Sequence, residues 1–304
     1  MIFEPEFVEL LERLVEKGEE GELSRLLERG PTPPAVEPIP TPRYRSGLIV
    51  SGNRPKHLNK LDELPADFII LNLEDGVPKK QKKVALLSIG LFLQHLPKIG
   101  KELMVRINPL TEGGRGEVEF LEQFPIHSYR LPKVKGVAEV EELLQLTKKR
   151  VDISIETAEA FFNLLSFRDL PVKLLFLGIY DLLNSLYLSH SLIQLENPLI
   201  SQILSRFTLE SRGSRKVPIG FVYQKYRDLE GFRRWCLLQR QLGMEGVGVI
   251  TPTQAQIANQ IFSRDLELAC KIVEEFEKRG PFTRDGLYID EPIYKNFKFL
   301  LEKG

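Results

Sequence analysis

The sequence predicts an α/β protein built on one closed (β/α)₈ (TIM) barrel. Eight short apolar runs rich in β-branched residues recur along the chain, and each is followed by enough residues for a helix and two turns. All eight units fit into roughly 210 residues, a length typical of a closed barrel, whereas an open doubly wound sheet is the alternative. The chain of 304 residues therefore has room for one barrel and an addition at each end.

The first element, residues 1–42, precedes the barrel. Residues 1–30 contain nine Glu against four Lys or Arg, and apolar side chains recur at helical spacing from Phe7 to Val15. This pattern predicts one or two acidic amphipathic helices. Residues 31–42 contain six prolines, which is typical of an extended linker. We therefore expect a helical extension and a linker, with a partner-binding role open to them.

The barrel is expected within residues 43–279, and its eight strands follow one another in chain order. The predicted strands are SGLIV (46–50), ADFIILNL (66–73), ELMVRI (102–107), SYRLPKV (128–134), VDISIE (151–156), VKLLFLG (172–178), VPIGFVY (217–223) and GVGVIT (246–251). One or two helices follow, up to residue 279. Residues 280–304 add an Asp-Gly turn and a final amphipathic helix, which predicts a C-terminal lid or an arm exchanged between subunits.

The composition argues against several classes of protein. The 42 basic residues cancel the 42 acidic ones, so no net field attracts nucleic acid or an anionic membrane. No stretch approaches the roughly 18 apolar residues of a membrane span. The two cysteines, Cys236 and Cys270, form no disulfide framework. We expect a soluble cytoplasmic protein whose partner is a small molecule or another subunit.

Acidic residues end two neighbouring strands of the predicted barrel. Glu156 ends the fifth strand, and Asp181 follows the sixth strand after Gly178. Side chains at the carboxyl ends of barrel strands meet at one rim, where two carboxylates repel each other unless a cation lies between them. Oxygen ligands without nearby His or Cys favour Mg²⁺, with Mn²⁺ as the alternative. Pairing of both acids with Lys or Arg on the surface is the commoner arrangement for such residues.

The third strand carries a charge at its end, Arg106, within the apolar run MVRIN. Burying an arginine is costly unless it holds an anion, and its guanidinium fork fits a carboxylate. The anion is either a ligand or the side chain of Glu74 or Asp75, and the sequence leaves both readings open. No GxSxG elbow, P-loop or GxGxxG motif is present, which argues against a serine hydrolase or a nucleotide-dependent enzyme.

Several segments, taken in order, resemble the citrate lyase beta subunit family of the HpcH/HpaI aldolase superfamily, which includes malyl-CoA and citramalyl-CoA lyases. The resemblance covers most of residues 44–300. Its segments are RSGLIVSGNRPKHLNK, ADFIILNLEDGVP, VRINPL, RLPKV, ISIETAEAFFNL, LFLGIYDLL, LGMEGVGVITPTQ and DGLYIDEP.

The resemblance implies a (β/α)₈ barrel that forms homo-oligomers and uses Mg²⁺ to make or break a carbon–carbon bond next to a thioester. The substrate would be a hydroxy-dicarboxylate thioester, and the products a ketoacid and an acyl thioester of CoA or an acyl-carrier protein. By position, Glu156 and Asp181 resemble the metal ligands. Arg106 resembles the residue that grips the ketoacid carboxylate, and Gly178 lies with Asp181 at the substrate.

The resemblance also assigns roles to acidic residues outside the metal pair. Glu74 and Asp75 resemble carboxylates that contact the residues of the site and do not bind the metal directly. Asp290 is similar to an acid/base that a neighbouring subunit inserts in some CoA lyases of the family, and Asp285 is the less favoured candidate.

Five positions depart from the family pattern. Asn72 stands where an Asp is usual, and Ser51 replaces a proline. Val247 and Thr251 occupy the places of a Lys and a His, and Gly220 the place of an Asp. Two alternatives therefore stay open beside the lyase: a catalytically silent barrel that serves as a binding or structural subunit, and a malyl-type thioester hydrolase.

Overall fold

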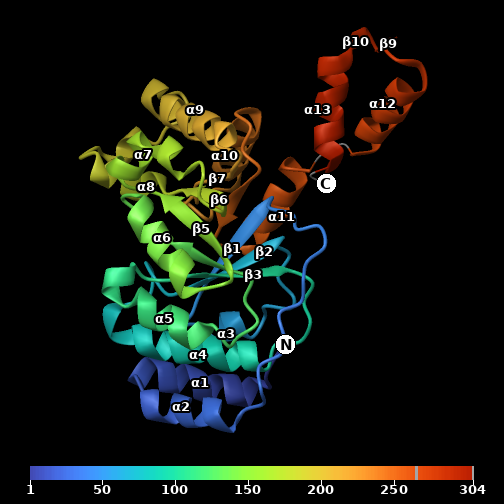
Figure 1. Cartoon of the computed structure of the whole chain (residues 1–304). Coiled ribbons are helices and arrows are strands. Elements are labelled where there is room, and N and C mark those ends of the chain that lie inside the picture. The colour runs from blue at the N-terminus through green and yellow to red at the C-terminus, as the bar shows by residue number, and fades with distance from the viewer. Residues whose placement is uncertain (264–265, 303–304) are drawn as a thin grey trace.

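The computed structural model describes residues 1–263 and 266–302, and eight parallel strands in it close into a barrel in chain order (Figure 1). The strands are β1 (Ser46–Ser51), β2 (Phe68–Asn72), β3 (Glu102–Arg106), β4 (Ser128–Leu131), β5 (Arg150–Ile155), β6 (Val172–Leu177), β7 (Val217–Gly220) and β8 (Gly246–Val249). The last strand pairs with the first, because Gly47 of β1 lies opposite Gly248 of β8. The prediction of a closed barrel is confirmed, and the open doubly wound sheet is excluded.

Helices between the strands cover the outside of the barrel. They are α3 (Pro55–Leu58), α4 (Lys82–Gln94), α5 (Gly114–Leu121), α6 (Val137–Leu146), α7 (Ala158–Phe162), α8 (Ile179–Ser185), α9 (Pro198–Gly213), α10 (Leu229–Gln241) and α11 (Pro252–Ile261). Short 3₁₀ turns occupy Lys79–Gln81, Leu110–Glu112, Leu164–Phe167 and His190–Leu192. Among the helices of the described residues, none combines the length and the apolarity needed to cross a bilayer.

The inside of the barrel is apolar in its middle and charged at its amino-terminal end. Its middle is filled by inward side chains of Tyr44, Phe68, Ile70, Met104, Leu174, Phe176 and Ile219. At the amino-terminal end, Arg150 forms ion pairs of 2.8 Å with both Glu102 and Asp152. These charges compensate one another and close that end of the barrel, so the carboxyl-terminal rim is the end where a ligand site can form.

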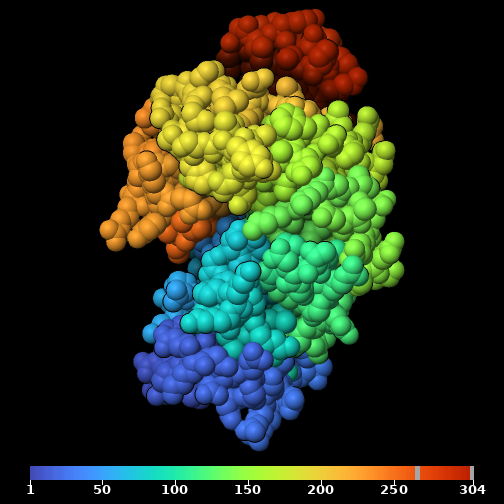
Figure 2. Space-filling view, turned by 90° about the vertical axis from the view of Figure 1, so that its left-hand side faces the viewer, coloured from blue at the N-terminus to red at the C-terminus, as the bar shows by residue number. Residues whose placement is uncertain are grey.

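The N-terminal extension packs against the barrel's own helix α4. It forms α1 (Pro5–Lys17) and α2 (Glu20–Arg29), so the prediction of one or two acidic helices is confirmed. Every residue of α4 from Val84 to Gln94 is buried, partly beneath Leu11, Val15 and Leu23 of the extension. Figure 2 shows this segment in blue directly below the cyan surface that includes α4. The extension therefore completes the fold by covering an apolar helix.

The C-terminal segment forms an arm with a small core of its own. It comprises α12 (Leu266–Arg279), the hairpin β9 (Phe282–Arg284) and β10 (Leu287–Ile289), and α13 (Glu291–Glu302). The predicted Asp-Gly turn joins the two strands, with positive φ angles of 49° at Asp285 and 79° at Gly286. Helix α12, which the sequence groups with the barrel, packs on the hairpin and α13. Figure 1 shows the arm projecting from the barrel beyond α11.

Candidate functional site

The carboxyl-terminal rim of the barrel brings Glu156 close to the start of α8. Glu156 follows β5 directly, is 3% exposed, and accepts a 2.7 Å hydrogen bond from the backbone N–H of Lys133. A Cβ atom on Gly178 would lie 2.3 Å from Oε2 of Glu156, so the carboxylate fills the space that a side chain would take. Asp181, in the first turn of α8, is close enough for its negative charge to act on Glu156.

The electrostatic surroundings of Glu156 suit a cation. Burial raises the pKa of this carboxyl, and the charge of Asp181 raises it further, while the positive charges of Arg130 and Arg106 act in the opposite direction. A cation between Glu156 and Asp181 would relieve both the burial and the repulsion. The described residues contain no cluster of three or more His, Cys, Asp or Glu with metal-binding geometry. Two carboxylates supply oxygen ligands that suit Mg²⁺, an ion that keeps its other positions for water or ligand oxygens.

Arg106 lies beside this pair, and the structure shows which residue neutralises it in the absence of a ligand. Its Nη2 atom lies 2.8 Å from Oε2 of Glu74, and its Nε donates a 2.7 Å hydrogen bond to Asn72. Glu74 also forms a 2.6 Å ion pair with Lys133. Burial acts to raise the pKa of Glu74, but the charges of Arg106 and Lys133 outweigh it and lower this pKa to about 2. Of the two partners that the sequence allows within the protein, Arg106 forms its ion pair with Glu74.

Arg106 keeps donors for a further partner. Its Nη1 atom has no hydrogen-bond partner among the residues that the structure describes, and the side chain is 11% exposed. The ion pair with Glu74 therefore orients the guanidinium without using all of its five N–H groups.

Asp75 and Lys133 line the outer side of the same cluster. Asp75 is about half exposed (54%), and its Oδ1 lies 3.3 Å from Nζ of Lys133. Burial and the neighbouring charge of Glu74 raise the pKa of Asp75. Lys133 has a φ angle of 52°, in the left-handed region that non-glycine residues seldom adopt. This conformation lets its backbone N–H bind Glu156 while its amine reaches Glu74 and Asp75.

Arg130 is a buried charged residue near the rim that the sequence did not single out as part of the site. It is 4% exposed, donates a 2.8 Å hydrogen bond from Nε to Ser154, and stacks 4.1 Å from the centre of the Phe176 ring. Burial, together with the nearby charge of Arg106, lowers the pKa of Arg130 to about 10. The alternation of strand β4 could have identified it, because Ser128 and Arg130 share the inward face.

The structure gives structural explanations for three departures from the family pattern. A Cβ atom on Gly220 would lie 2.0 Å from Oε1 of Gln239, so the amide of Gln239 fills the space of a larger side chain. Thr251 caps α11 by accepting a 3.2 Å hydrogen bond from the backbone of Gln254. The Oδ1 atom of Asn72 accepts from Arg106, as an aspartate oxygen would.

The acidic residues of the tail lie apart from this rim. Asp285 occupies the hairpin turn of the arm, and Asp290 accepts a 3.1 Å hydrogen bond from the backbone of Ile293 at the start of α13. Figure 1 shows the arm that carries both residues away from β5 and α8, the elements next to Glu156 and Asp181. Asp290 therefore caps a helix of the arm in the isolated chain.

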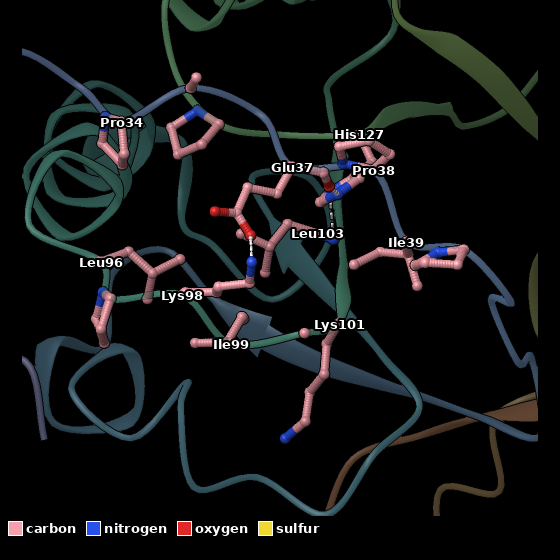
Figure 3. Close-up of a pocket in the computed structure, with 15 residues that line it drawn as sticks. Pro34, Glu37, Pro38, Ile39, Leu96, Lys98, Ile99, Lys101, Leu103 and His127 are labelled. Atoms are coloured by element: carbon pink, nitrogen blue, oxygen red, sulfur yellow. Dashed lines mark hydrogen bonds and ion pairs between the residues drawn. The ribbon is translucent and has the colours of Figure 1, made fainter.

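A cavity of about 380 Å³ lies at the opposite end of the strands, between the proline-rich linker and the segment that leads into β3 (Figure 3). His127 accepts a hydrogen bond from the Leu103 N–H at Nδ1, and its Nε2 lies 2.9 Å from the carbonyl of Glu37. Lys98 forms a 2.5 Å ion pair with Glu37. These contacts fasten the linker to the barrel, and the cavity shares no residue with the rim site.

Comparisons with known proteins show which family the sequence matches. The model of the HpcH/HpaI aldolase/citrate lyase family matches residues 45–252. A (3S)-malyl-CoA thioesterase of Cereibacter sphaeroides is 27% identical over 259 residues, covering 83% of this chain and 90% of that protein. The citrate lyase subunit beta of Haemophilus influenzae is 26% identical over 285 residues, covering 86% of this chain and 96% of that protein. The mitochondrial citramalyl-CoA lyase of Rattus norvegicus is 26% identical over 280 residues, with 83% of each chain covered.

Solved structures share the fold. The CitE protein of Mycobacterium tuberculosis, in complex with magnesium, acetoacetate and coenzyme A, superimposes with a TM-score of 0.70 at 22% identity. The match covers 85% of this chain and 97% of that chain. The citrate lyase beta subunit of the same organism, complexed with oxaloacetate and magnesium, gives a TM-score of 0.64 at 21% identity, with 78% and 99% covered.

Proposed function

The chain belongs to the HpcH/HpaI aldolase/citrate lyase family, and from this premise we propose that it is a Mg²⁺-dependent carbon–carbon lyase. It would split a hydroxy-dicarboxylate thioester into a ketoacid and an acyl thioester, or form the same bond in reverse. The observation that carries the proposal is the buried carboxylate of Glu156 beside Asp181, in a space that Gly178 leaves open. The carrier of the thioester is CoA or an acyl-carrier protein.

Glu156 and Asp181 would hold the Mg²⁺ ion, with Mn²⁺ as an alternative occupant. When bound, the ion supplies a Lewis acid that stabilises negative charge on the ketoacid oxygens. Arg106 would bind the ketoacid carboxylate through the donors that its pair with Glu74 leaves free. Glu74 and Asp75 would keep Arg106 and Lys133 oriented, and Gly178 would leave room for the carboxylate of Glu156 at the substrate site.

Cleavage leaves the acyl thioester as an enolate, whose carbon must receive a proton. We assign this step to Asp290 of a second copy in a homo-oligomer, since the arm of one chain does not reach its own rim (Figure 1). A positioned carboxylic acid accelerates such a step by roughly 10²- to 10⁴-fold. Support for an exchanged arm comes from its own apolar core and from Leu287 and Tyr288, which are 48% and 60% exposed on it.

Two other functions remain as outcomes of the test. The similarity to proteins named (3S)-malyl-CoA thioesterase favours a hydrolase that releases the acid from its carrier with water. Two positions that differ from the family pattern have structural roles: Gly220 makes room for Gln239, and Thr251 caps α11. These roles favour a silent barrel that only binds. The two cysteines are free, which agrees with the reducing cytoplasm that we propose as its location.

Calorimetric titration of chelator-treated protein with Mg²⁺, with and without oxaloacetate, tests the site. We expect each ligand to strengthen binding of the other, and this coupling to vanish in the double variant Glu156→Gln, Asp181→Asn. Asp228→Asn is the matched control, because Asp228 is an acid after β7 that caps α10 outside the site. Absence of Mg²⁺ binding to the unmodified protein, or equal binding to the double variant, would overturn the proposal.

Product analysis then separates the reactions. Incubation with citryl-, malyl- and citramalyl-CoA should give a ketoacid and an acyl-CoA from at least one of the three, whereas release of free CoA would identify a hydrolase. Asp290→Asn should lower turnover by roughly 10²- to 10⁴-fold without changing Mg²⁺ binding. Co-expression of Asp290→Asn with Glu156→Gln should restore part of the activity, because mixed oligomers hold complete sites. No restoration would contradict the exchanged arm.

A further inference from the structure

Arg130 is a buried cation without a counter-ion. It lies inside the barrel just below the rim, with 4% of its surface exposed. Within the described part of the chain, its polar contact is the Nε hydrogen bond to Ser154, and it forms no ion pair. Arg150, the buried arginine at the other end of the barrel, is paired with both Glu102 and Asp152. This contrast with Arg150 indicates that the guanidinium of Arg130 can bind an anionic group of a ligand.

The neighbours of Arg130 cannot supply that anion. Asp152, its register partner on β5, is occupied by Arg150 and by the backbone N–H of Leu174. Glu156 interacts with Arg130 through its charge but forms no ion pair with it. Arg106, the register partner on β3, adds a second positive charge. Burying an unpaired charge costs several kcal/mol. The unpaired Arg130 therefore destabilises the folded protein, and an anionic ligand would remove this destabilisation.

Arg130 is also fixed in place. Phe176 lies against the face of its guanidinium at 4.1 Å, and Ser154 holds its Nε. This arrangement leaves the terminal nitrogens as the donors for a ligand. Since the pKa of Arg130 stays near 10, the group is cationic at neutral pH. A fixed guanidinium with free terminal N–H groups matches the geometry of a carboxylate.

We propose that Arg130 binds the second carboxylate of a keto-dicarboxylic acid and makes the site selective for ketoacids that carry two carboxylates. The inference rests on the proposed function, in which Glu156, Asp181 and Arg106 hold the ketone and its adjacent carboxylate. We place the remaining substituent of the ketone toward Arg130, whose guanidinium lies against Phe176 inside the barrel. A carboxymethyl group would neutralise this charge, whereas the hydrogen of glyoxylate or the methyl of pyruvate would leave it buried and unpaired.

The test compares ketoacids of different charge on the Mg²⁺-loaded protein. Calorimetric titration should give tighter binding of oxaloacetate than of pyruvate or glyoxylate. In Arg130→Met we expect oxaloacetate to bind about 30-fold or more weakly, because its second carboxylate loses its partner. Binding of pyruvate and glyoxylate should change by less than about threefold. The melting temperature of the unliganded variant should stay or rise, since an apolar side chain replaces an unpaired charge.

Two further variants keep the test decisive. Arg130→Lys retains the charge but loses the fork, so it should keep a reduced preference for oxaloacetate. Arg150→Met is the matched control at the other end of the barrel. It should lower the melting temperature, because Glu102 and Asp152 lose their partner, and should leave the ratio of oxaloacetate to pyruvate affinity unchanged.

Failure of the role proposed for Arg130 can be distinguished from failure of the proposed function. If the unmodified protein binds pyruvate as tightly as oxaloacetate, or if Arg130→Met weakens all three ketoacids equally, Arg130 is not a selectivity residue and the proposed lyase function still stands. If no ketoacid binds together with Mg²⁺, the proposed function fails and the role of Arg130 fails with it.

Discussion

The ion pairs of Glu74 predict how stability depends on pH. The folded protein lowers the pKa of this carboxyl from 4.5 to about 2, because the charges of Arg106 and Lys133 outweigh burial. A group whose pKa is lower in the folded state stabilises the fold above its unfolded pKa, and this contribution disappears as the pH falls through the folded value. Glu74 should therefore stabilise the fold above about pH 4.5.

The size of the effect follows from the shift. The difference between the pKa of Glu74 in the unfolded and the folded state corresponds to about 3 kcal/mol of folding stability at neutral pH. About 2 kcal/mol of it should be lost between pH 6 and pH 3. In Glu74→Gln this titration is absent, and Arg106 and Lys133 lose their counter-charge, so the variant should be about 3 to 5 kcal/mol less stable at pH 7.

Urea unfolding at several pH values between 6 and 3 measures the effect. The gap in unfolding free energy between the unmodified protein and Glu74→Gln should narrow by about 2 kcal/mol over this range. Glu159→Gln, at an exposed acid outside the cluster, controls for general acid sensitivity. Parallel pH dependence of the unmodified protein and Glu74→Gln would refute the reasoning.

Three further predictions concern packing. Leu23→Ala should lower the unfolding free energy by about 2 to 5 kcal/mol in urea titrations, because Leu23 is fully buried in the extension. Gly178→Ala should weaken Mg²⁺ binding at least about tenfold by calorimetry, because the new Cβ displaces the carboxylate of Glu156. Gly220→Asp should lower the melting temperature through its clash with Gln239, and adding Gln239→Ala should recover part of the loss.

Each of these has a clear contrary result. An unchanged stability of Leu23→Ala would mean that the extension does not cover α4 in solution. Unchanged Mg²⁺ affinity of Gly178→Ala would remove Glu156 from the metal site. If Gly220→Asp is as stable with Gln239 as without it, the amide does not occupy that space.

The eight strands could be predicted because their residues are buried on both faces of the sheet. In β2, for example, all five residues from Phe68 to Asn72 are buried, and the sequence carries that burial as a continuous apolar run. The strand order followed from the predicted fold class, since each strand of a closed (β/α)₈ barrel lies beside the next strand in the chain.

The pairing of charges at the rim could not be predicted in the same way. Arg106 had Glu74 and Asp75 as adjacent candidates in the sequence, and only side-chain geometry distinguishes the 2.8 Å contact with Glu74. Arg130 was not singled out because it lies within strand β4, whereas candidate residues were sought at the carboxyl ends of the strands. The grouping of α12 with the arm depends on apolar contacts across the hairpin, which periodicity within one helix does not report.

The burial of α4 beneath α1 and α2 has a consequence for synthesis of the chain. The two helices emerge before α4, whose last residue, Gln94, is added 65 residues after Arg29. At roughly 5 to 20 residues per second, translation needs about 3 to 13 s to supply that partner. During this interval the apolar faces of Leu11, Val15 and Leu23 have no native cover. Until α4 emerges, residues 1–30 therefore expose apolar side chains that a chaperone at the ribosome can bind.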